Sequence, residues 1–269
     1  MSTVGASGAI AFRELHHRHG APILLPNAWD HASAAALAVA GFPAVGTTSL
    51  GVAAAAGLPD GAGRTHAETL RLARVLGGGP FLLSVDVEGG FSDNPAEVAD
   101  LAAELAEAGA VGVNLEDGRA DGGLTPPRLH LAKITAVKSA VPWLFVNART
   151  DTHWLGGGHY AETASRLAAY QDAGADGVFV PVLTDPASIA AAVGATALPL
   201  NVLATPDGPS LARLAELGVR RVSLGSLLFR LALGAAVDTA TSLHTNGVFP
   251  QTPSVPGYAA VQALASPRS

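Results

Sequence analysis

The sequence predicts an α/β protein that folds as a (β/α)8 TIM-type barrel. Short apolar segments alternate with longer helix-forming segments along the chain, which is typical of parallel βαβ units. The helix-forming segments repeatedly end in glycine before an apolar segment, as at Gly41, Gly109, Gly174 and Gly218, because glycine readily takes the left-handed conformation that closes a helix. The 269 residues have the length of one such barrel.

The expected elements follow this alternation from one end of the chain to the other. We expect loose residues over 1–8 and an amphipathic helix over 9–19. The expected strands lie at 22–25, 44–47, near 83, and at 111–115, 143–148, 177–180, 200–202 and 221–224. The expected helices between and after them lie near 31–40, 65–76, 95–108, 127–139, 160–173, 186–193, 209–217 and 226–243. An open doubly wound sheet is the alternative, but the first strand is not followed by the glycine-rich phosphate turn that favours it.

The domain prediction is one catalytic barrel over residues 1–245 and a proline-rich tail over residues 246–269. The tail contains Pro250, Pro253 and Pro256, and then a short helix-forming segment at 258–264.

Composition limits the class of protein. Charged residues make up only 14% of the chain, against roughly 25% in soluble domains, so we expect a homodimer or homotetramer that covers apolar surface. The net charge is −6 and no basic run appears, which argues against a nucleic-acid partner. The chain lacks cysteine, which excludes disulfides and thiolate chemistry. No signal-like or membrane-spanning apolar run is seen, and we expect a cytoplasmic protein without a membrane partner.

Carboxylates gather where two expected strands end. The segment from Ser84 to Gly90 places Asp86 and Glu88 two residues apart, so that both point to one face of a strand end. Glu116 and Asp117 follow the next strand. Such acids repel one another unless a cation or proton lies between them, and oxygen ligands suit Mg²⁺, with Mn²⁺ as an alternative. For each acid alone, helix capping is an equally good interpretation.

Active-site groups of a barrel lie at the carboxyl ends of its strands. There the sequence places Arg149, which follows the fifth strand, and Asn201, at the end of the seventh. Arg149 is either a structural partner of the carboxylates or a bidentate ligand for an anionic substrate.

The ordered set of motifs resembles the isocitrate lyase/phosphoenolpyruvate mutase superfamily. The matching segments are 27–30 (NAWD), 41–42 (GF), 46–49 (GTTS), 58–60 (LPD), 86–90 (DVEGG), 114–117 (NLED), 147–151 (NARTD) and 173–177 (AGADG). The resemblance covers roughly residues 10 to 235.

The resemblance implies a role for each matching residue. Asp86, Glu88 and Glu116 match the acids that hold Mg²⁺. Thr48, Ser49 and Leu50 match the segment that holds the substrate carboxylate. The catalytic set is then Asp60, which matches a mobile aspartate near the reacting centre, with Arg149 and Glu116. Asp86 and Arg149 belong to the expected substrate-binding set as well, and Asn201 joins it because of its place at a strand end. In relatives, a C-terminal helix packs on, or swaps with, a neighbouring subunit.

The resemblance implies a Mg²⁺-dependent lyase that cleaves a C–C bond in a small 2-oxo or 2-hydroxy acid through an enolate. An oxaloacetate-like dicarboxylate is the favoured substrate. The loop 118–127 departs from the family, because it lacks the lysines, cysteine and histidine of the lyase branch and the lysine and asparagine of the phosphonomutases. Arg119 is the candidate cation that would replace the missing charged gate residue of this loop. The alternative is that Arg119 is a solvated surface arginine without this role. Phosphonopyruvate or phosphoenolpyruvate mutase chemistry, or an oxo-acid binder without catalysis, are the alternative functions.

Overall fold

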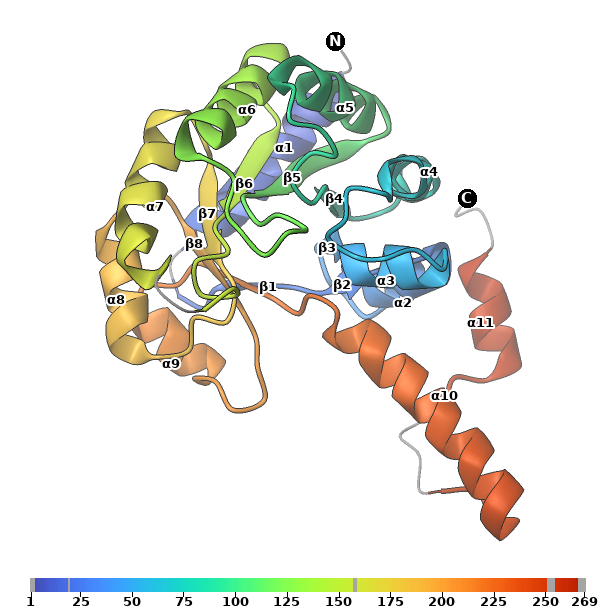
Figure 1. The fold of residues 1–269 in the computed structure, drawn as a ribbon. Helices are drawn as coiled ribbons and strands as arrows, with labels where there is room; N and C mark the ends of the chain where they lie inside the picture. The colour runs from blue at the N-terminus through green and yellow to red at the C-terminus, as the bar shows by residue number, and fades with distance from the viewer. Residues whose placement is uncertain (1–2, 19, 157–158, 251–254, 266–269) are drawn as a thin grey trace.

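The computed structural model describes residues 3–18, 20–156, 159–250 and 255–265. Within them, parallel strands form one closed sheet surrounded by helices (Figure 1). The strands are β1 (Ile23–Leu25), β2 (Asn27–Ala28), β3 (Ala44–Thr47), β4 (Leu82–Asp86), β5 (Ala110–Glu116), β6 (Phe145–Arg149), β7 (Gly177–Val180), β8 (Leu200–Leu203) and β9 (Arg221–Ser223). The predicted TIM-type barrel is confirmed.

The described strands number nine because proline divides the first one. β1 pairs with β9, and β2 pairs with β3, so the two pieces together close the barrel. Pro26 lies between them and has no N–H group to donate to the ladder. The Pro26 carbonyl still accepts a hydrogen bond from the Gly46 N–H at 2.8 Å, which connects the break between β1 and β2 to the neighbouring strand β3.

Most of the helices cover the outside of the barrel. The described helices are α1 (Thr3–His17), α2 (His31–Val39), α3 (Ser49–Ala55), α4 (His66–Leu76), α5 (Pro95–Glu107), α6 (Pro127–Ala140), the 3₁₀ helix η1 (His159–Glu162), α7 (Thr163–Asp172), α8 (Pro186–Gly194), α9 (Leu211–Glu216), α10 (Leu227–Asn246) and α11 (Tyr258–Leu264). Apolar side chains from the strands and the surrounding helices form the main core. Within the described residues, no helix combines the length and apolar character needed to cross a membrane.

Two helices differ from the prediction. Residues 3–8 are helical rather than loose, because α1 closes the amino-terminal end of the barrel with Phe12 fully buried. The Phe12 ring meets that of Phe145 edge to face at 5.3 Å between centroids. α3 is not among the helices expected from the sequence, and it begins two residues after the end of β3.

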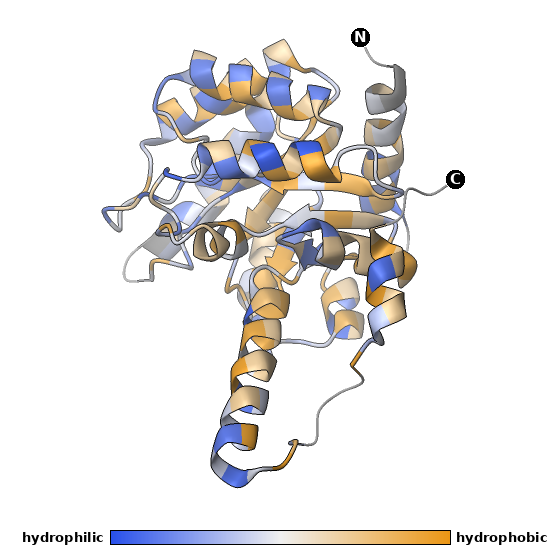
Figure 2. Cartoon of the chain, turned by 90° about the vertical axis from the view of Figure 1, so that its right-hand side faces the viewer, coloured by the Kyte–Doolittle hydropathy of each residue, from blue (hydrophilic) through white to orange (hydrophobic). Residues whose placement is uncertain are grey.

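The C-terminal helices leave the barrel. α10 projects away from it and none of its residues is buried (Figure 1). Hydrophobic residues occupy much of this helix (Figure 2). α11 turns back toward α2, where His31 Nε2 lies 3.0 Å from the Leu264 carbonyl oxygen. The division at residue 245 stays a prediction, and 251–254 and 266–269 of the tail lie outside the described residues.

Candidate active site

A cavity of about 260 Å³ opens at the carboxyl ends of the strands. Residues of β2 and of β4 to β9 contribute to its wall, and segments that follow β3, α3, β6, β7 and β9 complete it. Its lining residues are Asn27, Thr48, Ser49, Leu50, Asp60, Gly61, Asp86, Asn114, Glu116, Arg149, Trp154, Phe179, Pro181, Leu203, Ser223, Gly225 and Ser226. Most of the predicted site residues are therefore brought together.

Arg149 is the centre of an ion-pair network in this wall. Its Nη1 lies 2.7 Å from Glu116 Oε2, and its Nε and Nη2 donate to the two carboxylate oxygens of Asp151 at 2.6 and 3.1 Å. Burial raises the pKa of Glu116 well above its ordinary value, and Arg149 opposes that rise. Burial works to lower the pKa of Arg149, but the carboxylates of Glu116 and Asp151 raise it overall. Arg149 is therefore a permanent cation among acids.

Asp86 faces the cavity without a cationic hydrogen-bond partner among the described residues. Its backbone N–H donates to Thr47 Oγ1, and its Oδ1 accepts only the Glu88 N–H at 3.2 Å. Burial raises the pKa of Asp86 to about 6, with Arg149 acting in the opposite direction. A carboxylate in this position is suited to a cation that the protein itself does not supply.

Glu88 lines a different pocket from the other two expected metal ligands. Its carboxylate accepts hydrogen bonds from the Gly63 N–H at 2.9 Å and from Thr65 Oγ1 at 2.6 Å, and the side chain is 2% exposed. A positive φ of 48° turns the chain at this residue. In the described part of the chain, no three His, Cys, Asp or Glu side chains are grouped to hold a metal ion.

The remaining donors still fit Mg²⁺. This ion keeps several waters and is often bound through one or two carboxylates together with oxygens of the substrate. Asp86 and Glu116 line one cavity and supply such a pair.

Two polar residues at strand ends serve the barrel rather than the cavity. Asn201, expected to bind substrate, is 0% exposed and exchanges hydrogen bonds with Ser223 Oγ at 3.0 and 3.1 Å. Asp117 is fully buried and accepts hydrogen bonds from Arg166, Tyr170 and a backbone N–H. It anchors the loop that follows β5.

The family model for phosphoenolpyruvate phosphomutase matches residues 12–244. The chain belongs to the phosphoenolpyruvate mutase family. The resemblance seen in the sequence is thereby confirmed.

Several relatives of this family are similar over most of the chain. A Mycobacterium tuberculosis (strain H37Rv) protein of uncharacterised function is 44% identical over 257 residues, covering 94% of this chain and 95% of its own. The 2-methylisocitrate lyase of Bacillus subtilis is 35% identical over 168 residues, covering 59% of this chain and 55% of its own. A crystal structure of a Burkholderia cenocepacia protein, provisionally assigned as a lyase or mutase, has a TM-score of 0.89 at 38% identity and covers 99% of this chain and 98% of its own.

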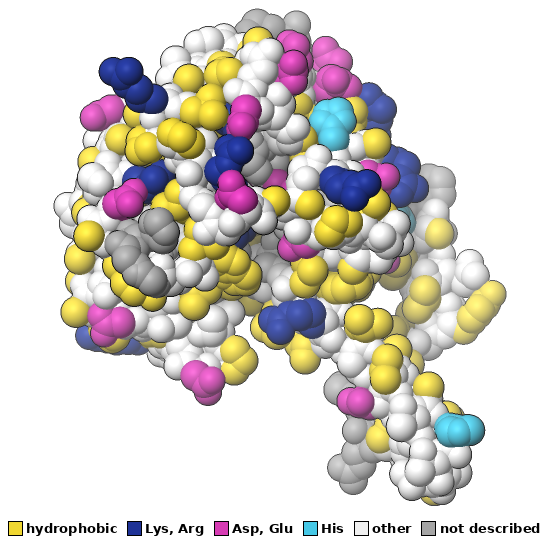
Figure 3. All heavy atoms as spheres, viewed as in Figure 1, with side chains coloured by type: hydrophobic (Ala, Val, Ile, Leu, Met, Phe, Trp, Pro, Cys, Tyr) yellow, Lys and Arg dark blue, Asp and Glu magenta, His cyan; other side chains and the backbone are white. Residues whose placement is uncertain are grey.

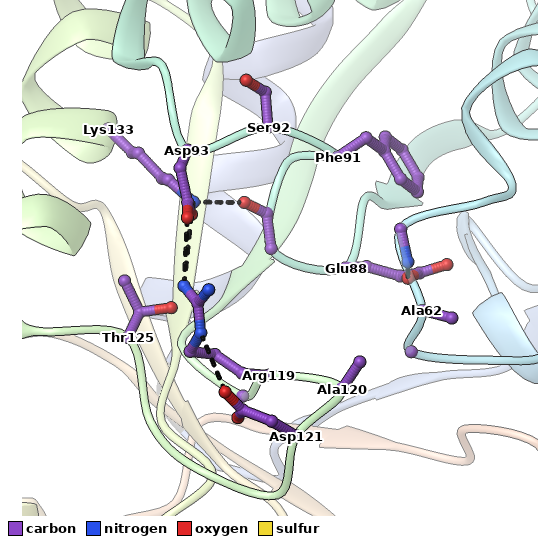
Figure 4. Close-up of a pocket in the computed structure, with 14 residues that line it drawn as sticks. Ala62, Glu88, Phe91, Ser92, Asp93, Arg119, Ala120, Asp121, Thr125 and Lys133 are labelled. Carbon is purple, nitrogen blue, oxygen red and sulfur yellow. Dashed lines mark hydrogen bonds and ion pairs between the residues drawn. The ribbon is translucent and has the colours of Figure 1, made fainter.

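The loop after Asp117, which differs from the family pattern, folds as a small hairpin beside the cavity. Gly118 and Leu124 form an antiparallel bridge, and the Arg119 N–H donates to the Gly123 carbonyl at 3.0 Å. The hairpin borders a second pocket of about 390 Å³, which Glu88 and Lys133 also line (Figure 4).

Arg119 is bound inside this second pocket. It donates to both carboxylate oxygens of Asp93 at 3.3 and 3.2 Å, and Asp121 lies 3.8 Å from its Nε. Lys133 approaches Asp93 from the other side and also donates to the Gly89 carbonyl at 2.9 Å (Figure 4). In this conformation the candidate substitute cation is held away from the cavity that contains Asp86.

Sequence reasoning missed the apolar part of the cavity wall. Phe179 and Leu203 read as ordinary strand residues, whereas Trp154 has two interpretations from the sequence, a pocket-lining residue or a packed loop aromatic, and it lines the cavity. The available signal was their position, because residues at the last position of a barrel strand, or just after it, border the mouth.

Proposed function

We propose that this protein is a Mg²⁺-dependent lyase that cleaves a C–C bond in a small 2-oxo or 2-hydroxy acid. The observation that supports it best is the arrangement of Asp86, Glu116 and Arg149 in one small cavity at the strand ends. Asp60 lines the same cavity. Oxaloacetate, favoured by the family resemblance, is the reference dicarboxylate.

Arg149 orients the substrate in this proposal. A guanidinium has five N–H donors, and two of them bind Asp151 while another faces Glu116. At most two remain to bind the carboxylate or carbonyl of a substrate. Because the ion pairs hold Arg149 in place, its remaining donors are preorganised, which lowers the entropy cost of orientation.

The polar residues after β3 hold the carboxylate end of the substrate. Thr48 and Ser49 line the cavity, and Thr48 precedes α3 without a side-chain capping bond. Its hydroxyl is therefore available to a ligand. Leu50 closes the same side of the cavity and excludes water from the reacting atoms.

The metal ion would be held by Asp86 and Glu116. Mg²⁺ bound there would act as a Lewis acid toward negative charge that develops beside the carbonyl when the C–C bond breaks. Asp60 is the proposed group that moves the proton, because it borders the cavity and its charge acts on Asp86.

Phosphonopyruvate rearrangement is the second candidate function. The family model that matches the chain is that of a phosphomutase, which keeps P–C chemistry in the set of reactions to be tested. An oxo-acid binder without turnover is the third candidate, supported by the position of Arg119 on Asp93.

Turnover assays test the proposed function. The purified protein with Mg²⁺ is incubated with pyruvate, oxaloacetate, 2-oxoglutarate, methylisocitrate and phosphonopyruvate, and binding is followed in parallel by calorimetry. We expect Mg²⁺-dependent turnover of an oxo or hydroxy acid that Glu116→Gln reduces by at least about 100-fold, as for loss of one electrostatic group in a site. Glu216→Gln, the same change in an exposed pair with Arg213, is the control. Binding without turnover would contradict the lyase and support the binder.

We further propose that α10 and the tail join subunits of a homodimer or homotetramer. The side chains of Leu231, Leu233 and Val237 in α10 are each more than half exposed. Hydrophobic side chains are visible on the surface of the projecting helix α10 (Figure 3). Deleting the residues after Gly247 is expected to give smaller assemblies in light scattering. An unchanged molar mass would contradict this role for the tail.

A further inference from the structure

The charges in the candidate active site are unevenly balanced. Among the described residues that line the 260 Å³ cavity, the acids are Asp60, Asp86 and Glu116, and the cation is Arg149. One divalent ion would bring this set to neutrality, and each substrate carboxylate would then add one negative charge. A second carboxylate would add uncompensated negative charge to a confined space, which is costly where water is scarce.

Arg149 is poorly placed to neutralise a second carboxylate. Its charge is already shared by Glu116 and Asp151. Its guanidinium carbon lies 5.8 Å from the centroid of the Trp154 ring and 5.6 Å from that of the Phe179 ring. Because these two rings lie near the guanidinium, they take up space in which a polar group of the substrate could otherwise approach Arg149.

The nearest cations of the neighbouring pocket are also engaged. Arg119 binds Asp93, and Lys133 binds Asp93 and the Gly89 carbonyl. Neither Arg119 nor Lys133 lines the cavity that contains Asp86. No cation of the second pocket therefore compensates a second carboxylate in the first.

One side of the cavity is apolar. Trp154, Phe179, Pro181 and Leu203 line it together, and we call these four residues the apolar wall. Phe179 and Leu203 lie on the neighbouring strands β7 and β8, and Trp154 follows β6. Trp154 is 56% exposed, so it stands at the open end of the cavity, where bound substrate would cover more of its ring. An alkyl group against this wall gains roughly 25 cal/mol for each Å² removed from water.

We propose that the substrate is a 2-oxo monocarboxylic acid whose far end is an uncharged alkyl group seated on the apolar wall. This inference rests on the proposed function for the reaction, and it selects 4-hydroxy-2-oxo acids with alkyl tails over dicarboxylates such as oxaloacetate. The 4-hydroxyl loses its proton to a base, and its oxygen forms the carbonyl of a departing aldehyde. The C3–C4 electron pair moves to C3 as the enolate of pyruvate, which is then protonated. Atoms and electrons balance without an oxidant or second substrate.

A matched pair of substrates tests the proposal. 4-Hydroxy-2-oxopentanoate and 4-hydroxy-2-oxopentanedioate share one head and differ by a methyl group against a carboxylate. With Mg²⁺, we expect kcat/KM to favour the methyl compound by at least about 10-fold, within the range that a pocket gains from apolar contacts. Faster turnover of the dicarboxylate would overturn the proposal.

Variants test whether the apolar wall causes the preference. Trp154→Ala and Phe179→Ala are expected to lower kcat/KM for the methyl compound about 10-fold while kcat/KM for the dicarboxylate changes less. Tyr160→Ala is the control, because Tyr160 is similarly exposed and does not line the cavity. Equal losses for both substrates in the two wall variants would overturn the role of the wall.

Binding of uncleavable acids separates this inference from the proposed lyase activity. We expect 4-methyl-2-oxopentanoate to bind at least about 10-fold more tightly than 2-oxoglutarate in calorimetry with Mg²⁺. That preference without turnover of any substrate would support the apolar wall and contradict the lyase. Tighter binding of 2-oxoglutarate would overturn the inference even if the protein is a lyase, and binding of neither acid would overturn both.

Discussion

Arg149 and Glu116 are direct register partners on β6 and β5, and their side chains meet at 2.7 Å beside the cavity. The barrel thus makes this contact from backbone pairing, since neighbouring residues of parallel strands point to the same face. The same register places Asn147 beside Asn114 one layer deeper, where their side chains form a 2.9 Å hydrogen bond. Active-site geometry here follows from strand register.

Replacement of Arg149 is expected to damage both activity and stability. Arg149→Met leaves Glu116 and Asp151 without their cation, and loss of one partner of a buried ion pair costs about 3–5 kcal/mol. We expect kcat/KM to fall by at least about 100-fold, measured beside urea unfolding at pH 7.5. Arg149→Lys should recover part of the stability and little activity, because lysine lacks the bidentate fork. Full activity in Arg149→Met would contradict the assigned role.

Asp86 is expected to make stability depend on pH and on Mg²⁺. Burial raises its pKa from 3.8 to about 6, so between these values the folded protein holds the proton more tightly than the unfolded chain. This group's contribution to the free energy of unfolding therefore declines as pH rises from about 4 to about 6. At pH 7.5 without Mg²⁺, Asp86→Asn should be more stable than wild type by about 1–2 kcal/mol. This gain is smaller than the full pKa shift would give, because Asp86 is partly exposed.

Thermal unfolding at several Mg²⁺ concentrations checks the same substitution. Wild type should gain Tm as Mg²⁺ rises, because a ligand of the folded state stabilises it, and Asp86→Asn should gain much less. An equal Mg²⁺ response in both proteins would exclude Asp86 as a ligand.

Asp93 is expected to stabilise the loops around the second pocket through Lys133. The Lys133 side chain is 3% exposed, and burial lowers its pKa while Asp93 raises it. Asp93→Asn should cost about 1–3 kcal/mol, because a buried ammonium loses its charged partner. Arg119→Gln is the control and should cost less than about 1 kcal/mol, as for partly exposed ion pairs. Urea unfolding compares the two, and the reverse ranking would show that Arg119 carries the interaction.

Arg221 is expected to limit the stability of the barrel. It is fully buried, its Nε and Nη2 donate to the neutral acceptors Ser223 Oγ and Asn114 Oδ1, and its Nη1 lacks a partner among the described residues. Burial lowers its pKa to about 9, so its charge is costly at neutral pH. Arg221→Met should leave the free energy of unfolding unchanged or raise it by about 1–4 kcal/mol. A loss above about 3 kcal/mol would show that hydrogen bonds outweigh the charge cost.

The sequence determined the order of strands and helices and the position of each acid along them. Apolar periodicity, helix-ending glycines and the motifs from Asp86 to Asp151 are local features, so the amino-acid order alone was enough to assign Thr48, Asp86, Glu116 and Arg149 to strand ends. The break of the first strand at Pro26 was also local, but its consequence was not, because closure of the barrel depends on two different partner strands.

Tertiary structure alone decided where those side chains point and which apolar residues join them. Glu88 binds Thr65, 23 residues earlier in the chain, and Asn201 binds Ser223 on the neighbouring strand, so neither could be placed from its own segment. The apolar wall draws Trp154, Phe179 and Leu203 from three successive βα units. Local sequence specifies the strand and its face, whereas hydrogen-bond partners and cavity walls arise between segments that only folding brings together.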